Sequence, residues 1–154
     1  MRWEEGRAVV ERLLADRELE RVPSDLGGAK ALLESARRHL ESARKIRDGD
    51  PEGAYATTYD AARKACAALL EAQGLRATSR GGHVALREAV VSQFGSLSGG
   101  EVLRSFDRLR RRRNDIEYPD GESGIDLDEL DEALVRATEI VEYAWKLAPE
   151  LPSF

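Results

Sequence analysis

The stretch RSFDRLRRRRNDIEYP, residues 104–119, carries the strongest pattern in the chain. Its apolar side chains recur at steps of three and four residues, which predicts an amphipathic helix with the stripe Val102, Phe106, Leu109, Arg113 and Ile116. Arg113 thus falls on the apolar stripe, whereas other arginines face elsewhere: Arg104, Arg108 and Arg111. Because an unpaired buried charge is costly, we expect Arg113 to meet a carboxylate, a second subunit or a bound phosphate.

Length and composition predict the fold class. A chain of 154 residues with 42% hydrophobic residues has the size of one domain and can bury a core of its own. Aromatic residues make up only 6%, and Ala, Leu, Arg and Glu dominate, which favours an all-α antiparallel helical bundle. The single Cys66 excludes an internal disulfide framework. No secretory or membrane-length apolar segment is visible, so we expect a cytoplasmic protein without a membrane partner.

Helix signals divide the chain into an accessory helix (residues 1–23), a bundle of four to five core helices (24–148) and a tail (149–154). The first helix is expected from Trp3 to about Arg21, before Pro23. Ser24 or Asp25 caps the second, whose leucines and alanines alternate in a heptad-like register. The third begins at Pro51 and ends at Gly74, and its short connection to the second predicts an antiparallel pair.

Two further helices precede and follow the arginine-rich helix. Residues 75–82 are expected to form a polar loop in which Thr78 or Ser79 caps a short helix. The arginine-rich helix is expected to begin near Gly100 and to end by Tyr118, because a residue before proline is pushed out of the helical region. Asp126 is the predicted N-cap of the last helix.

Charge is distributed unevenly along the chain. Residues 104–113 hold six arginines and one acid, whereas residues 114–142 hold eleven acids and one arginine. Two interpretations remain open: the two segments neutralise each other, or the basic helix binds a phosphodiester. The preference for arginine over lysine points to a GC-rich bacterial genome.

Common catalytic patterns are absent from the sequence. His39 and His83 belong to no Glu-x-x-His pair, and Cys66 alone cannot form a zinc site, so we expect no metal. Neither a phosphate-binding glycine loop nor a nucleophile elbow is present, and we expect no cofactor. Cys66 is interpreted as a small core residue.

Three segments together resemble the HEPN superfamily: YATTYDAARKA (residues 55–65), GGH (81–83) and RNDIEY (113–118). The resemblance covers roughly residues 25–148. It implies an all-α domain of the kind found in prokaryotic toxin–antitoxin and defence systems and in many ribonucleases. In that family an arginine, a polar residue and, after a spacer, a histidine form the ribonuclease motif at a dimer interface. Arg113 and Asn114 match its first two positions, and Tyr118 stands where the histidine is expected.

The resemblance implies roles for these residues. Arg113 would clamp the scissile phosphate, Asn114 would orient it, and Tyr118 would donate a proton or a hydrogen bond. A tyrosine with a pKa near ~10 is a poor base at neutral pH. Further arginines either track an RNA backbone or pair with Glu129 or Glu132 in a solvated face: Arg110, Arg111 and Arg112.

Three more residues are candidates for substrate binding. His83 lies near a helix start and either replaces the missing base or caps and packs. Asp60 either pairs with Arg63 or Lys64 along its own helix or holds Arg113, and Tyr59 would then line the cleft.

These residues lead to three hypotheses about function. The first is a metal-independent HEPN ribonuclease or toxin component, active as a homodimer on RNA and neutralised by a nucleotidyltransferase-type antitoxin. The alternative is a non-catalytic HEPN domain that binds RNA, a nucleotide or a partner protein. A third possibility is a structural adaptor whose charges set the register of a dimer.

Overall fold

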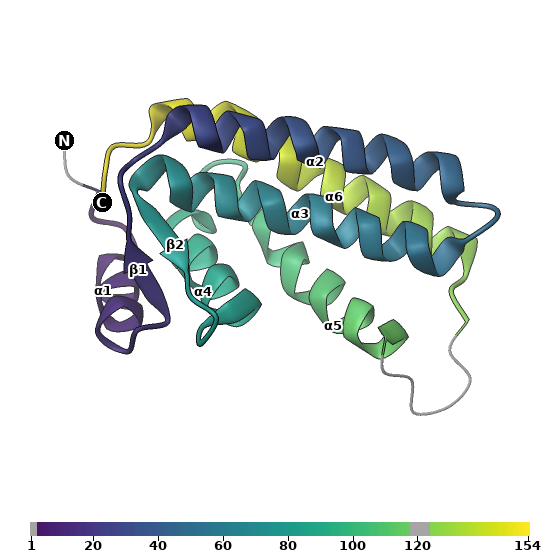
Figure 1. Cartoon of the computed structure of the whole chain (residues 1–154), viewed down its shortest axis with the longest axis horizontal. Coiled ribbons are helices and arrows are strands. Elements are labelled where there is room, and N and C mark those ends of the chain that lie inside the picture. Colours follow the sequence, from purple (N-terminus) through teal and green to yellow (C-terminus); the bar gives the residue numbers. More distant parts are fainter. Residues whose placement is uncertain (1–2, 118–123) are drawn as a thin grey trace.

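The computed structural model describes residues 3–117 and 124–154, and three long helices lie side by side in it (Figure 1). They are α2 (Leu26–Ile46), α3 (Pro51–Gln73) and α6 (Leu127–Leu147). Four residues connect α2 to α3, so the two helices form the expected antiparallel pair. The all-α helical bundle predicted from composition is therefore confirmed.

Capping residues fix the ends of these helices as the sequence predicts. The Asp25 carboxylate accepts a hydrogen bond from the N–H of Gly28 (2.8 Å), and Asp126 accepts one from Asp128 (2.8 Å). Pro51 is the first residue of α3. Gly74 ends α3 with φ at 78°, in the left-handed region that a glycine adopts without strain.

The core follows the heptad-like pattern of α2. Its buried residues are Ala29, Leu33, Ala36, Leu40 and Ala43. Leu26 is the first residue of α2 and the first leucine of this pattern, and it is 38% exposed. Helix α3 contacts α2, α6, α4 and α5, which explains why it is buried on more than one side. Cys66 of α3 is fully buried, and burial raises the pKa of its thiol to about 12, as suits a core residue.

Two shorter helices, α4 (Gly82–Phe94) and α5 (Ser105–Glu117), pack on α3 (Figure 1). The helix expected near Gly100 begins as a 3₁₀ turn, η1 (Gly100–Arg104), and becomes α-helical only at Ser105. The predicted cap of α4 was wrong, since Gly81 occupies that position. Thr78 instead accepts a hydrogen bond from Gly81 N–H (3.3 Å) and donates one to the Arg17 carbonyl (2.6 Å), which ties the loop to a distant segment.

The N-terminal region differs most from expectation. Helix α1 covers only Arg7–Ala15, because Arg17 adopts a positive φ of 61° and reverses the chain. The residues that follow form β1 (Leu19–Arg21), which pairs antiparallel with β2 (Leu75–Ala77) in the segment expected to be a loop. Such pairing depends on contacts between distant residues, and three-residue strands leave no periodic signal.

Helix α1 is joined to the bundle through α4. Its Val10 and Leu13 are fully buried in the common core, and Gly6 lies so close to the backbone of Ser92 that a side chain would collide there. The chain ends in a 3₁₀ turn, η2 (Ala148–Glu150), followed by residues 151–154. The division of the chain at residues 23 and 148 stays a prediction. No helix in the described ranges is long and apolar enough to cross a membrane.

Candidate functional site

Tyr59 lies at the centre of the junction between α3, α4 and α5. Its side chain is buried, and its ring stacks on Phe106 with centroids 5.5 Å apart and an interplanar angle of 15°. The hydroxyl is hydrogen-bonded to Nδ1 of His83 at 2.5 Å, and the guanidinium carbon of Arg113 lies 5.7 Å from the ring centroid. One side chain of α3 thus positions one residue from each of two other helices, and we call Tyr59, His83 and Arg113 the junction site.

The hydrogen bond from Tyr59 fixes the tautomer of His83. Burial raises the pKa of Tyr59, so its hydroxyl keeps its proton, and His83 is its only hydrogen-bond partner within the described residues. The hydroxyl therefore donates to Nδ1, and a neutral imidazole then carries its own proton on Nε2. His83 consequently presents an N–H donor at Nε2, which suits binding of a phosphate oxygen and not proton abstraction.

His83 is kept neutral by its surroundings. Partial burial lowers the pKa of the imidazole, and the positive charges of Arg63, Arg113 and Arg110 lower it further against the opposing effect of Asp60. A histidine among three guanidiniums is therefore uncharged at neutral pH. Binding of an anion among them would offset these charges and raise the pKa of His83.

Arg113 occupies the apolar stripe of α5, as predicted, but it is not fully buried. Its side chain is 29% exposed, and Nη2 forms an ion pair with Glu117 one turn later at 3.0 Å. Nη1 lies 3.5 Å from Oδ1 of Asn114. The carboxylate expected beside Arg113 is thus supplied by its own helix, and the pair remains within reach of solvent.

Asp60 takes part in a separate charge cluster on α2 and α3. It accepts hydrogen bonds from Arg63 (2.7 and 2.9 Å), and its other oxygen lies 3.0 Å from His39 Nε2 and 3.6 Å from Lys64 Nζ. Burial opposes ionisation of Asp60, but Arg63, Lys64 and His39 outweigh it and lower the pKa of the carboxyl. Of the two interpretations open for Asp60, the structure therefore has the local pairing and not a contact with Arg113.

The arginines of α5 pair partly with α6 and partly within α5 itself. Arg112 reaches α6, where it pairs with Glu129 at 2.5 Å and donates to the Gly124 carbonyl. Arg110 and Arg111 both pair with Asp107, at 3.1 and 2.9 Å. Arg112 is therefore paired with the acidic helix, whereas Arg110 lies close enough to influence the pKa of His83.

The structure brings together four of the predicted site residues, namely Tyr59, His83, Arg110 and Arg113, with Asn114 at their edge. Asp60 forms an ion pair with Arg63 and acts on His83 through its charge, whereas Arg112 pairs with Glu129 of α6. Tyr118, the third predicted catalytic residue, lies outside the described residues.

Two further basic residues belong near the junction site. Arg63 follows Tyr59 by four residues, one turn of α3, and this spacing is visible in the sequence. Arg87 follows His83 by the same interval on α4, and its Nε lies 3.8 Å from Asp107 on α5. Asp107 thus faces Arg87, Arg110 and Arg111, which leaves an excess of positive charge beside His83.

The chemistry available here is that of an anion site. Guanidiniums and an imidazole N–H favour phosphate oxygens by charge and by hydrogen bonding. Within residues 3–117 and 124–154, no group of three or more His, Cys, Asp or Glu side chains is placed to hold a metal ion.

The fold and the site thus define a class of protein: an all-α bundle with a cationic site at the junction of three helices. The family model described as "HEPN domain" matches residues 29–147, and the chain belongs to this family. The match includes nearly all of α2 and the whole of α3, α4, α5 and α6, and therefore every residue of the junction site. Searches among curated proteins and among solved structures found no match to this chain.

Proposed function

We propose that this protein is a metal-independent HEPN ribonuclease that acts on RNA as a homodimer and serves as the toxin of a toxin–antitoxin or defence module. One observation carries the proposal: Tyr59 holds the motif arginine, Arg113, and the N–H donor of His83 at one half-exposed junction. Family membership supports it, because the arginine and the polar residue of the HEPN ribonuclease motif match Arg113 and Asn114.

The proposed reaction is transesterification within RNA. The ribose 2′ oxygen bonds to the adjacent phosphorus, the bond from phosphorus to the 5′ oxygen breaks, and a 2′,3′-cyclic phosphate forms. The 2′ proton passes to solvent, and the departing 5′ oxygen takes a proton from Tyr118. Arg113 and the Nε2 donor of His83 would stabilise the charge that develops on the phosphoryl oxygens. Because His83 is a donor in this arrangement, the reaction lacks a strong base and is expected to be slow.

In the proposed dimer, two junction sites approach each other across one RNA strand. Glu117 must then release Arg113 to the phosphate, and exposure of both side chains allows this exchange. A nucleotidyltransferase-type antitoxin would silence the enzyme by modifying Tyr118, whose hydroxyl the reaction requires.

The test uses purified protein and total RNA in EDTA. Arg113→Ala removes the proposed clamp, and Arg112→Ala is its matched control, since Arg112 pairs with Glu129 away from the junction site. We expect cleavage with cyclic phosphate ends in the wild type and in Arg112→Ala, and its loss in Arg113→Ala and Tyr118→Phe. Equal cleavage in all variants would refute the assignment of Arg113, and a monomer at micromolar concentration in light scattering would refute the dimer.

A second candidate function is RNA binding without cleavage. It is favoured by the neutral, donating state of His83 and by the pairing of Arg113 with Glu117, since neither supplies a base. RNA that is retained in a salt-dependent way but never cut would establish this function. If RNA is neither cut nor retained, both candidates fail.

A further inference from the structure

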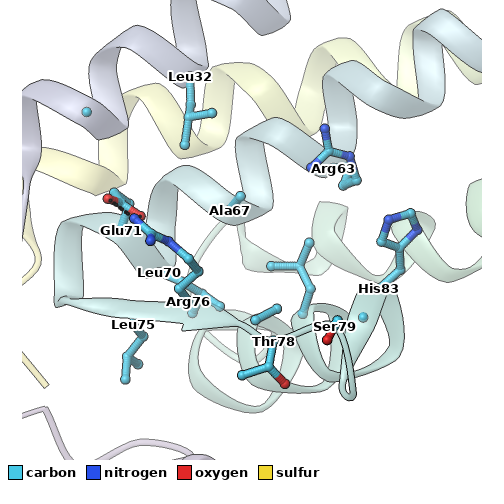
Figure 2. A pocket seen from close by; sticks show the side chains of 14 residues that line it. Leu32, Arg63, Ala67, Leu70, Glu71, Leu75, Arg76, Thr78, Ser79 and His83 are labelled. Atoms are coloured by element: carbon cyan, nitrogen blue, oxygen red, sulfur yellow. Dashed lines mark hydrogen bonds and ion pairs between the residues drawn. The ribbon is translucent and has the colours of Figure 1, made fainter. Parts of the chain in front are cut away.

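A pocket of about 550 Å³ opens beside His83, and Figure 2 shows the side chains that line it. Helices α2 and α3 form one wall, and β2 with the start of α4 forms the other. Its volume lies within the range of about 300–1,000 Å³ that is usual for small-ligand sites. The pocket is therefore large enough for a nucleoside.

The two ends of the pocket differ in chemistry. Arg63 and His83 stand together at one end, whereas the ion pair between Glu71 and Arg76 (3.2 Å) closes the other (Figure 2). Apolar side chains cover the space between these ends: Leu32, Ala67, Leu70 and Leu86. An occupant should therefore have a flat or apolar body and an anionic group at one end.

The edge of β2 adds backbone hydrogen-bonding groups. Thr78 N–H donates to the Glu18 carbonyl and Val22 N–H to the Gly74 carbonyl, at 3.0 and 2.9 Å. Because hydrogen-bonded pairs alternate in an antiparallel ladder, the N–H and C=O of Ala77 point away from β1. No hydrogen bond from outside the sheet reaches Ala77 in the described parts of the chain. Ala77 lines the pocket, so it offers a donor and an acceptor side by side.

We propose that this pocket binds one unstacked nucleobase of an RNA strand, with the attached phosphate at Arg63. The inference rests on the proposed function and names a subsite for it. A nucleobase has an apolar face for Leu32, Leu70 and Leu86, and its edge carries donors and acceptors that match a backbone N–H and C=O. His83 belongs both to the pocket and to the junction site, so the next phosphate along the strand reaches Arg113.

The arrangement requires single-stranded RNA. Bases stacked inside a helix cannot enter a pocket between α3 and β2, whereas a base in a loop or at an end can be turned outward. The junction site would then act next to the nucleotide whose base is bound, and the pocket would give the enzyme its base preference.

The test measures binding of AMP, CMP, GMP and UMP to the full chain by calorimetry, with inorganic phosphate as the reference probe. Ala67→Trp fills the pocket from a partly exposed position on α3, and Ala8→Trp on the exposed face of α1 is the matched control. We expect at least one nucleotide to bind about tenfold more tightly than phosphate, since burial of the apolar face of a base against leucine side chains contributes a gain of this order. Ala67→Trp should abolish that gain, and Ala8→Trp should preserve it.

A second variant tests the pocket independently, in case Ala67→Trp does not fold. Leu32→Gln changes the same wall at a partly buried position on the other helix, α2, and it should weaken nucleotide binding without changing the affinity for phosphate. The inference is overturned if nucleotides bind no better than phosphate, or if folded Ala67→Trp and Leu32→Gln bind them like the wild type.

Failure of this inference can be distinguished from failure of the proposed function. Nucleotide binding that depends on Ala67, without any cleavage of RNA, supports the subsite and refutes the ribonuclease. Cleavage that depends on Arg113, in a protein that binds no nucleotide better than phosphate, refutes the subsite alone.

Discussion

Replacing Tyr59 by phenylalanine removes one hydroxyl from the junction site and keeps the ring. The stacking on Phe106 and the contact with Arg113 remain, so the change isolates the hydrogen bond to His83. Loss of that bond leaves Nδ1 without its donor, which costs about 1–2 kcal/mol. Truncation to alanine would also open a cavity and cost about 3–5 kcal/mol. We therefore expect Tyr59→Phe to lower the free energy of unfolding in urea by about 1–2 kcal/mol.

Tyr55 provides the matched control for this experiment. It is as buried as Tyr59 and lies on the same helix, but its hydroxyl forms no hydrogen bond within the described residues. Tyr55→Phe should therefore change the unfolding free energy by less than about 0.5 kcal/mol. Nitrogen-15 NMR should find the His83 proton on Nε2 in the wild type and both tautomers in Tyr59→Phe. A proton on Nδ1 in the wild type, or equal losses in the two variants, would refute the reasoning.

Three further predictions concern charge and buried polar groups. The pKa of His83 is lower in the folded protein than in the unfolded chain, where it is about 6.5, so folding favours the neutral imidazole. This stabilisation is fully present above pH ~6.5 and is lost as the pH falls through the lowered pKa of the folded protein. The melting temperature should hence fall more between about pH 7 and 5 in the wild type than in His83→Gln, and parallel curves would contradict this. Glu117→Gln should raise RNA affinity about two- to fivefold in filter binding, because it frees Arg113 from an exposed ion pair that contributes up to about 1 kcal/mol. Unchanged affinity would show that Glu117 does not compete with phosphate for Arg113. Gln73→Leu should lower the free energy of unfolding in urea by about 1–3 kcal/mol, because the buried amide of Gln93 loses its two hydrogen bonds to the Gln73 amide (2.8 and 3.0 Å). Adding Gln93→Leu should restore part of this free energy. Additive losses in the double variant would contradict the pairing.

The parts of the fold that could be predicted are those encoded locally. Asp25, Pro51, Gly74 and Asp126 each act through the backbone within one turn, and all four stand where the sequence predicts a helix end. The sheet of β1 and β2 was missed because its stability comes from residues more than fifty positions apart. Arg17 reverses the chain without being a glycine, and nothing in its neighbourhood indicates this.

The site could be predicted only in part, for a different reason. Helical spacing placed Arg113 on the inner stripe, and a family motif singled out its neighbours, but neither predicts where a long side chain ends. Asp60 illustrates the difficulty. Its carboxylate could reach Arg63 on the same helix or Arg113 on α5, and in the structure it accepts hydrogen bonds from Arg63. The hydrogen bond between Tyr59 and His83 joins residues 24 positions apart, so only the packing of α4 on α3 reveals it.

The number of arginines in α5 overstates its positive charge toward a ligand. Arg112 is paired with α6, and Asp107 offsets part of the charge of Arg110 and Arg111. What remains at the junction site is the guanidinium of Arg113, in a partly exposed ion pair with Glu117, and the neutral imidazole of His83. Such a site binds phosphate weakly in isolation and needs a second contact to hold an RNA strand. In the proposed dimer a partner subunit would supply that contact, and the pocket beside His83 can supply it within one chain.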